Sequence, residues 1–120
     1  MAAPRPAHDA ALFEALVSAM QAMEPEIRRG AMFGAPAVYL GRPMVGCVFG
    51  QGIGLKFPAS LAAQAIEAGC AIRFTPYNRK PMTEWIELRC ATRDLPAEAD
   101  LLSAAIEHAR ALPAAPQRKR

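Results

Sequence analysis

Residues 74–85 contain the side chains of this chain that are best suited to bind another molecule. Aromatic and basic residues are interleaved there, so the segment offers ring faces for stacking and cations for an anion or a nucleic acid. The candidate partner- or anion-binding residues are Phe74, Tyr77, Arg79, Lys80 and Trp85. A second interpretation is that the three rings anchor a proline-bounded loop onto a sheet while the two cations are only solvated.

Residues suited to catalysis or metal binding are few. Cys47 and His108 are a nucleophile and a base by type, but no local signature surrounds them and no neighbour would orient the histidine. The three cysteines, with Cys70 and Cys90, lie 20 or more positions apart, which is not the spacing of a zinc site or a redox dithiol. We therefore expect no catalytic residue, no metal and no cofactor, and we interpret the three thiols as buried.

A helix is expected at each end of the chain. Apolar residues recur at helical spacing after the N-cap Asp9, until Pro25 limits further extension. A last helix is expected to follow Pro96 and to finish near Leu112, because acids precede its apolar positions and bases follow them. Both helices are amphipathic, so each is expected to cover a sheet.

A short middle helix is expected between Pro58 and Gly69. Proline suits the start of a helix, and glycine suits the left-handed residue that ends one. The residues expected to face inward are Leu61, Ala62, Ala65 and Ile66.

Four short runs have the composition of strands. Residues 35–40, 44–49 and 53–57 are apolar segments bounded by glycine, and the connections between them are short enough to make neighbouring strands antiparallel. Residues 84–89 alternate polar and apolar types, which places Trp85 on the face opposite Ile86 and Leu88.

These patterns predict an α+β fold. Its single antiparallel sheet has about four strands in a meander, flanked by an N-terminal helix, a short middle helix and a C-terminal helix. Residues 9–112 are expected to form one domain between a flexible segment, 1–8, and a disordered basic tail, 113–120.

The net charge of +3 is carried by the tail, since Arg118, Lys119 and Arg120 follow a neutral remainder. Residues 28–93 nevertheless hold nine bases and three acids, so basic and acidic faces are expected to separate. The start of the chain lacks the apolar run of a signal peptide, and no run approaches the roughly 18 apolar residues of a membrane span. We therefore expect a cytoplasmic protein with no membrane contact.

Three motifs resemble the N-terminal domain of the TfoX/Sxy competence regulators. They are Met32-Phe33-Gly34, Leu55-Lys56, and Arg79-Lys80-Pro81-Met82 followed by Trp85. The resemblance covers about residues 32–112 and implies an α+β domain with no known catalytic residue and no cofactor. Within these motifs, we interpret Met32, Phe33, Gly34, Lys56, Pro81 and Met82 as structural.

The chain also departs from that family. It stops where the regulators continue into a C-terminal domain, so we expect a stand-alone domain, and it has Ala35 where the family often repeats glycine. The YjbR-like proteins are a second likeness, through a late strand that carries tryptophan.

The expected function is binding rather than catalysis. The family resemblance implies a transcription- or competence-related regulator that acts by binding a protein partner, as a monomer or a homodimer. The alternative is binding of nucleic acid, weakly, or of a small anionic ligand through residues 74–85.

Overall fold

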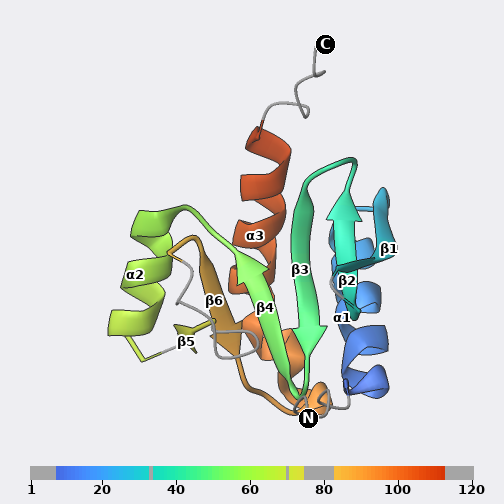
Figure 1. The fold of residues 1–120 in the computed structure, drawn as a ribbon, viewed down its shortest axis with the longest axis horizontal. Coiled ribbons are helices and arrows are strands. Elements are labelled where there is room, and N and C mark those ends of the chain that lie inside the picture. The colour runs from blue at the N-terminus through green and yellow to red at the C-terminus, as the bar shows by residue number, and fades with distance from the viewer. Residues whose placement is uncertain (1–7, 33, 70, 75–82, 113–120) are drawn as a thin grey trace, which may run out of the picture.

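The computed structural model describes residues 8–32, 34–69, 71–74 and 83–112. Within them, six antiparallel strands form one sheet, and three α-helices lie against one of its faces (Figure 1). The helices are α1 (Ala10–Met23), α2 (Ala59–Glu67) and α3 (Ala99–Ala111), and a 3-10 helix, η2 (Thr92–Glu98), precedes α3. The strands are β1 (Ile27–Met32), β2 (Ala35–Leu40), β3 (Met44–Phe49), β4 (Gly52–Lys56), β5 (Ile72–Arg73) and β6 (Trp85–Leu88). The α+β class and the antiparallel sheet agree with the prediction.

The prediction of about four strands is wrong, because β1 and β5 also belong to the sheet. Strand β1 was not predicted because only Ile27 is buried and the four residues after it are exposed. The strand therefore lacks an alternation of buried and exposed residues. Strand β5 has two residues, which is too short for any period to be visible.

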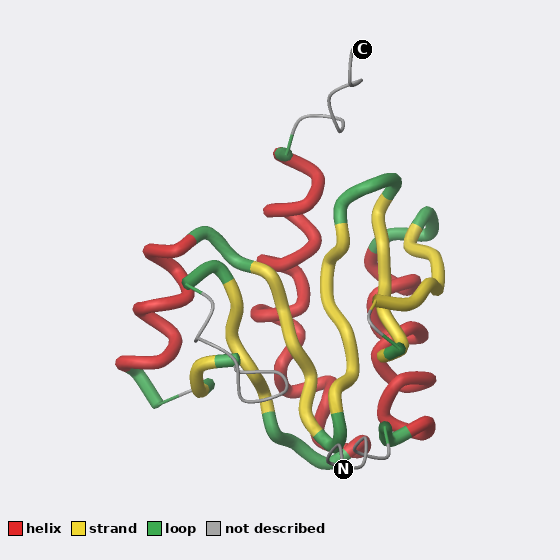
Figure 2. The backbone as a smooth tube through the Cα atoms, in the orientation of Figure 1, coloured by secondary structure: helices red, strands yellow, loops and turns green. Residues whose placement is uncertain are grey.

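The sheet departs from a simple meander at one edge. Its order is β1-β2-β3-β4-β6-β5, so the first four strands follow the chain while β6 lies between β4 and β5. Helix α2 makes this possible, since it carries the chain from the end of β4 to the far edge before β6 returns beside β4. The tube in Figure 2 shows the β2–β3 hairpin and the β3–β4 turn at opposite ends of the sheet.

A register shift in the β2–β3 pair decides which side chains of β3 reach each face. Val38 pairs with Gly46 but Tyr39 pairs with Met44, so Val45 is the extra residue of a bulge. As a result Val45 and Val48 both pack under the helices.

The main core lies between the sheet and the helices. It is formed by the apolar stripes of α1 and α3, by Leu95 of η2 and by one face of the strands. Asp9 caps α1 as predicted, accepting a 3.0 Å hydrogen bond from the amide of Leu12. The middle helix buries Ala62 and Ala65, but the expectation for Leu61 is wrong, because that side chain is 41% exposed.

Some predictions concern residues that the structure does not describe. These are the segments 1–7 and 113–120, Phe33, Cys70 and residues 75–82. Among the described residues, no helix is both long enough and apolar enough to cross a membrane.

Candidate binding surface

The sheet face opposite the helices carries a second, smaller apolar cluster. Ala37, Cys47, Phe74 and Trp85 are buried in it, and Met32, Tyr39, Met44 and Phe49 are partly buried around them. We call this surface the helix-free face and define it by these eight residues. The strand alternation and the β3 bulge place them together, since they come from β1, β2, β3, β6 and the residue that follows β5.

An aromatic row crosses the helix-free face. The ring of Phe74 lies 5.4 Å from that of Trp85 and 6.2 Å from that of Phe49, the latter edge-on. His8 continues the row, because its ring lies 5.4 Å from Phe49 while its Nδ1 accepts a 2.9 Å hydrogen bond from the amide of Gly50. The row thus ties the start of the described chain to the β3–β4 turn.

Phe74 and Trp85 are two of the five predicted binding residues, and both are buried. Phe74 is 1% exposed and Trp85 is 5% exposed, so neither ring presents a free face for stacking. Gly54 allows Phe74 to lie directly on the sheet, since a Cβ there would be 3.0 Å from its Cζ. This arrangement is what the second interpretation, anchoring of a loop, requires of these two rings.

The other three predicted binding residues, Tyr77, Arg79 and Lys80, lie outside the described residues, as do Phe33, Pro81 and Met82 of the family motifs.

Met32, Gly34 and Lys56 are the residues of the family motifs that were interpreted as structural and that the structure describes. Met32 ends β1 and is partly buried on the helix-free face. Gly34 has a φ of 82°, which the turn between β1 and β2 requires. Lys56 ends β4 directly opposite Trp85.

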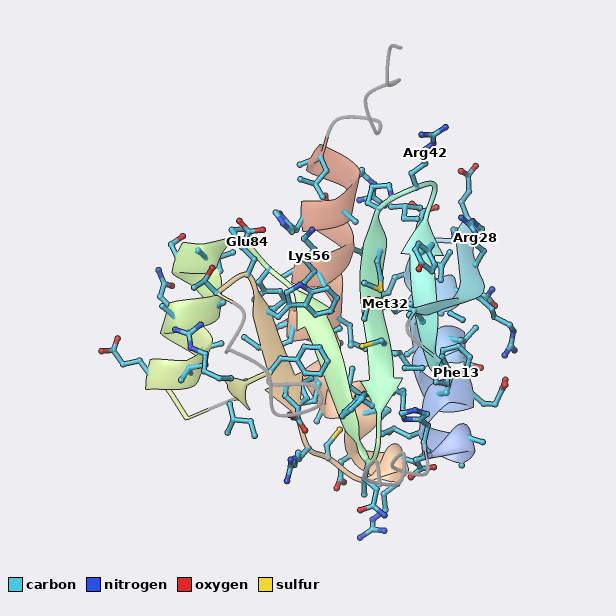
Figure 3. The ribbon with its side chains drawn as sticks, viewed as in Figure 1. Phe13, Arg28, Met32, Arg42, Lys56 and Glu84 are labelled. Carbon is cyan, nitrogen blue, oxygen red and sulfur yellow. The ribbon has the colours of Figure 1, made fainter. Side chains whose placement is uncertain are left out.

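Three cations lie beside the apolar part of this face. Figure 3 shows Lys56, Arg42 and Arg28, from left to right, above Met32 in the view. Arg28 donates a 2.9 Å hydrogen bond to the carbonyl of Gly41, and its Cζ lies 5.1 Å from the centre of the Tyr39 ring. Lys56, Arg28 and Arg42 form no ion pair with any residue that the structure describes.

Some other arginines of the described chain have carboxylate partners, whereas Arg73 and Arg93 form no ion pair with a described residue. Arg29 forms a bidentate pair with Glu14, with distances of 2.6 and 2.7 Å, and this hydrogen bond lowers the pKa of Glu14. Arg110 pairs with Glu24 and Glu107, and its hydrogen bond likewise lowers the pKa of Glu24. The three cations beside the helix-free face therefore differ from Arg29 and Arg110 in forming no ion pair with a described residue.

One buried acid belongs to the same side of the sheet. Glu87 is directly opposite Gly54 in β4 and is 8% exposed. Its Oε2 accepts a 2.8 Å hydrogen bond from Nε of Arg89, which keeps this carboxylate paired although it is buried.

The structure separates Cys47 from His108. Cys47 belongs to the helix-free face, while His108 lies on α3 under the other face, so the sheet stands between them. Burial raises the pKa of the Cys47 thiol to about 12, with Glu87 adding to the effect. The expectation that every cysteine is buried is wrong for Cys90, which is partly exposed. The described residues contain no group of three side chains that could hold a metal.

Sequence reasoning missed the parts of this surface that depend on pairing. Arg28 and Tyr39 come together because β1 pairs with β2, and β1 had not been recognised. Met44 and Phe49 belong to a predicted strand. Alternation places Phe49 on the face of Cys47, but only the bulge shows that Met44 shares it. Alternation within residues 35–40 was the available signal for Tyr39, since Ala37 and Tyr39 are two positions apart.

No protein-family model, curated protein or solved structure matches the chain. The resemblance to the N-terminal domain of the TfoX/Sxy regulators therefore stays a prediction.

Proposed function

We propose that this protein is a non-enzymatic regulator that binds a partner protein through the helix-free face. The observation that carries the proposal is a partly exposed apolar patch bordered by three cations without acidic partners. The TfoX-like motifs supply the proposed context, a transcription- or competence-related role in the cytoplasm.

The chemistry of the patch favours an acidic, amphipathic segment of the partner. Met32 and Met44 are unbranched and polarisable, so they adapt to apolar side chains of varied shape. Lys56, Arg28 and Arg42 would meet the acids of the same segment, which sets its orientation and speeds association. Cations that already had internal carboxylate partners would gain less from such a segment.

Binding of a nucleic acid or a small anion is the second candidate, and the same three cations favour it. Phosphate contacts would release counterions, so affinity would fall steeply as salt is raised. The burial of Phe74 and Trp85 weighs against base stacking by these two rings.

The test uses charge reversal on the face and a matched reversal elsewhere. Lys56→Glu reverses a cation on the helix-free face, and Arg93→Glu reverses an exposed cation of η2 that also has no ion pair among the described residues. Proteins captured from the host by the wild-type chain are purified, and their affinity for each variant is measured by calorimetry.

We expect Lys56→Glu to weaken binding of the captured protein at least about tenfold, while Arg93→Glu leaves it within about twofold. Equal affinity of all three chains would contradict the proposed face. Capture of nucleic acid in place of protein, with a steep dependence of affinity on salt, would favour the second candidate.

A further inference from the structure

Strand β1 forms one edge of the sheet that the described residues build. All six of its residues pair with β2, from Ile27 opposite Leu40 to Met32 opposite Ala35. The four residues between Ile27 and Met32 are exposed, and no further strand of the described chain lies beyond them (Figure 1). A regular, exposed edge can accept an extended segment of another chain through main-chain hydrogen bonds.

The hydrogen bonds of β2 show which residues of β1 direct their main-chain N–H and C=O groups away from β2. Pro36 has no N–H to give to β1, and Leu40 donates its N–H to the carbonyl of Pro43, on the β3 side, at 3.0 Å. Alternate residues of a strand face the same neighbour, so Val38 also faces β3. The residues of β1 opposite these three therefore direct their main-chain groups away from β2, and they are Ile27, Arg29 and Ala31.

The outward groups of Ile27 are already used. Its N–H donates to the carbonyl of Glu24 at 3.1 Å, and its carbonyl accepts from Nε2 of Gln21 at 3.0 Å. These bonds close the edge at the start of β1 and also confirm that Ile27 faces outward.

The outward groups of Arg29 remain available. Neither its main-chain N–H nor its carbonyl has a hydrogen-bond partner among the described residues, and the N–H of Ala31 has none either. The carbonyl of Ala31 accepts a 3.0 Å hydrogen bond from the hydroxyl of Tyr39. The edge thus offers two donors and one acceptor in a row, enough for a short added strand.

We propose that this edge binds an extended acidic segment of a partner protein by strand addition centred on Arg29. Arg28 and Arg29 project to opposite faces at the edge, and Arg28 has no carboxylate partner. Acids directly opposite arginines stabilise a strand pair, whereas like charges destabilise it. Arg29 already pairs with Glu14, so Arg28 is the cation of this edge that an acid of the added segment can meet, and its charge favours an acidic segment. The inference rests on the proposed function only in taking the ligand to be a protein.

The test uses a capped peptide of about seven residues that alternates Glu and Val, with a Lys-Val peptide as its control. Ala31→Pro removes one outward N–H and leaves the β1–β2 hydrogen bonds in place, since Ala31 does not donate to β2. A Glu-Val peptide with an N-methylated central residue removes a hydrogen bond without changing the protein.

We expect millimolar or tighter binding of the Glu-Val peptide, with amide shifts at Arg29 and Ala31. Ala31→Pro and the N-methylated peptide should each weaken it about fivefold, and the Lys-Val peptide should not bind. Lys56→Glu should leave it within about twofold, because Lys56 lies on β4.

Three results would overturn the inference. The first is that the Glu-Val peptide does not bind. The second is that Ala31→Pro and the N-methylated peptide both leave the affinity as high as that of the wild-type chain for the unmodified peptide. The third is a wild-type dimer that Ala31→Pro converts to a monomer, which would assign the edge to a second copy. Loss of peptide binding in Lys56→Glu alone would move the site to the helix-free face, which separates failure of this inference from failure of the proposed function.

Discussion

Replacing Gly54 with alanine tests the packing of the helix-free face directly. The added methyl would lie 3.0 Å from Cζ of Phe74, 3.2 Å from its Cε1 and 3.1 Å from Sγ of Cys47. These distances are all shorter than the roughly 3.5–4.0 Å at which non-bonded heavy atoms attract best. Phe74 and Cys47 are 1% and 0% exposed, so neither can move aside into solvent.

The magnitude follows from two opposing effects. Overpacking a filled site costs about 1–3 kcal/mol. Alanine in a strand gains back about 0.5–1 kcal/mol relative to glycine, because the unfolded chain loses less entropy on folding. Taking the middle of each range, we expect Gly54→Ala to lower the free energy of unfolding by about 1 kcal/mol.

The assay is urea denaturation followed by tryptophan fluorescence. Trp85 is the single tryptophan, and its ring lies 5.4 Å from that of Phe74, so the signal comes from the perturbed cluster. Phe74→Leu in the Gly54→Ala background supplies the control, since a smaller side chain makes room for the methyl. The two changes together should cost less than the sum of their separate costs by at least about 0.5 kcal/mol. A Gly54→Ala protein as stable as the wild type, or strictly additive costs, would refute the packing described here.

Two further predictions concern stability. The pKa of Cys47 is raised to about 12 in the folded protein from an ordinary value of 9.0, so the neutral thiol is favoured by folding. The contribution of this thiol to the free energy of unfolding is complete below pH 9 and is lost as the pH rises toward 12, by at most about 1.4 kcal/mol per pH unit. Cys47→Ala should remove this part of the decrease in the free energy of unfolding with pH. An unchanged decrease in the variant would contradict the prediction. Asp9→Ala should cost about 1 kcal/mol by removing the cap of α1, as measured by thermal unfolding, whereas Asp9→Asn should cost little because an asparagine oxygen can still accept from Leu12. Equal losses in the two Asp9 variants would point to a role other than capping.

Elements with strong local signals were predictable from the sequence. Strands β2 and β3 have the predicted bounds, and α1 begins after its predicted cap, because glycine turns and an aspartate N-cap act over a few residues. Strand β1 was missed because four of its six residues are exposed, since it is an edge strand. The bulge at Val45 had no local signal either, because it is a property of the β2–β3 pair.

The candidate surface was predictable only in part, for the same reason. The interleaved aromatic and basic residues near Phe74 and Trp85 indicated the side of the sheet on which the candidate surface lies. The burial of the two rings depends on contacts with residues far away in the chain. Phe49 meets Phe74 across 25 positions of sequence, and no spacing rule predicts that contact. The cation at Arg28 likewise reaches the surface through a strand pairing that the sequence does not reveal.

Hydrogen–deuterium exchange of the chain with and without its captured partner protein tests the central claim most directly. If the partner occupies the helix-free face, amides of β3 and β4 and of the β2–β3 hairpin should exchange more slowly in the complex, while α3 on the opposite side should be unchanged. Slower exchange confined to α1 and α3, with β3, β4 and the hairpin unaffected, would contradict the account.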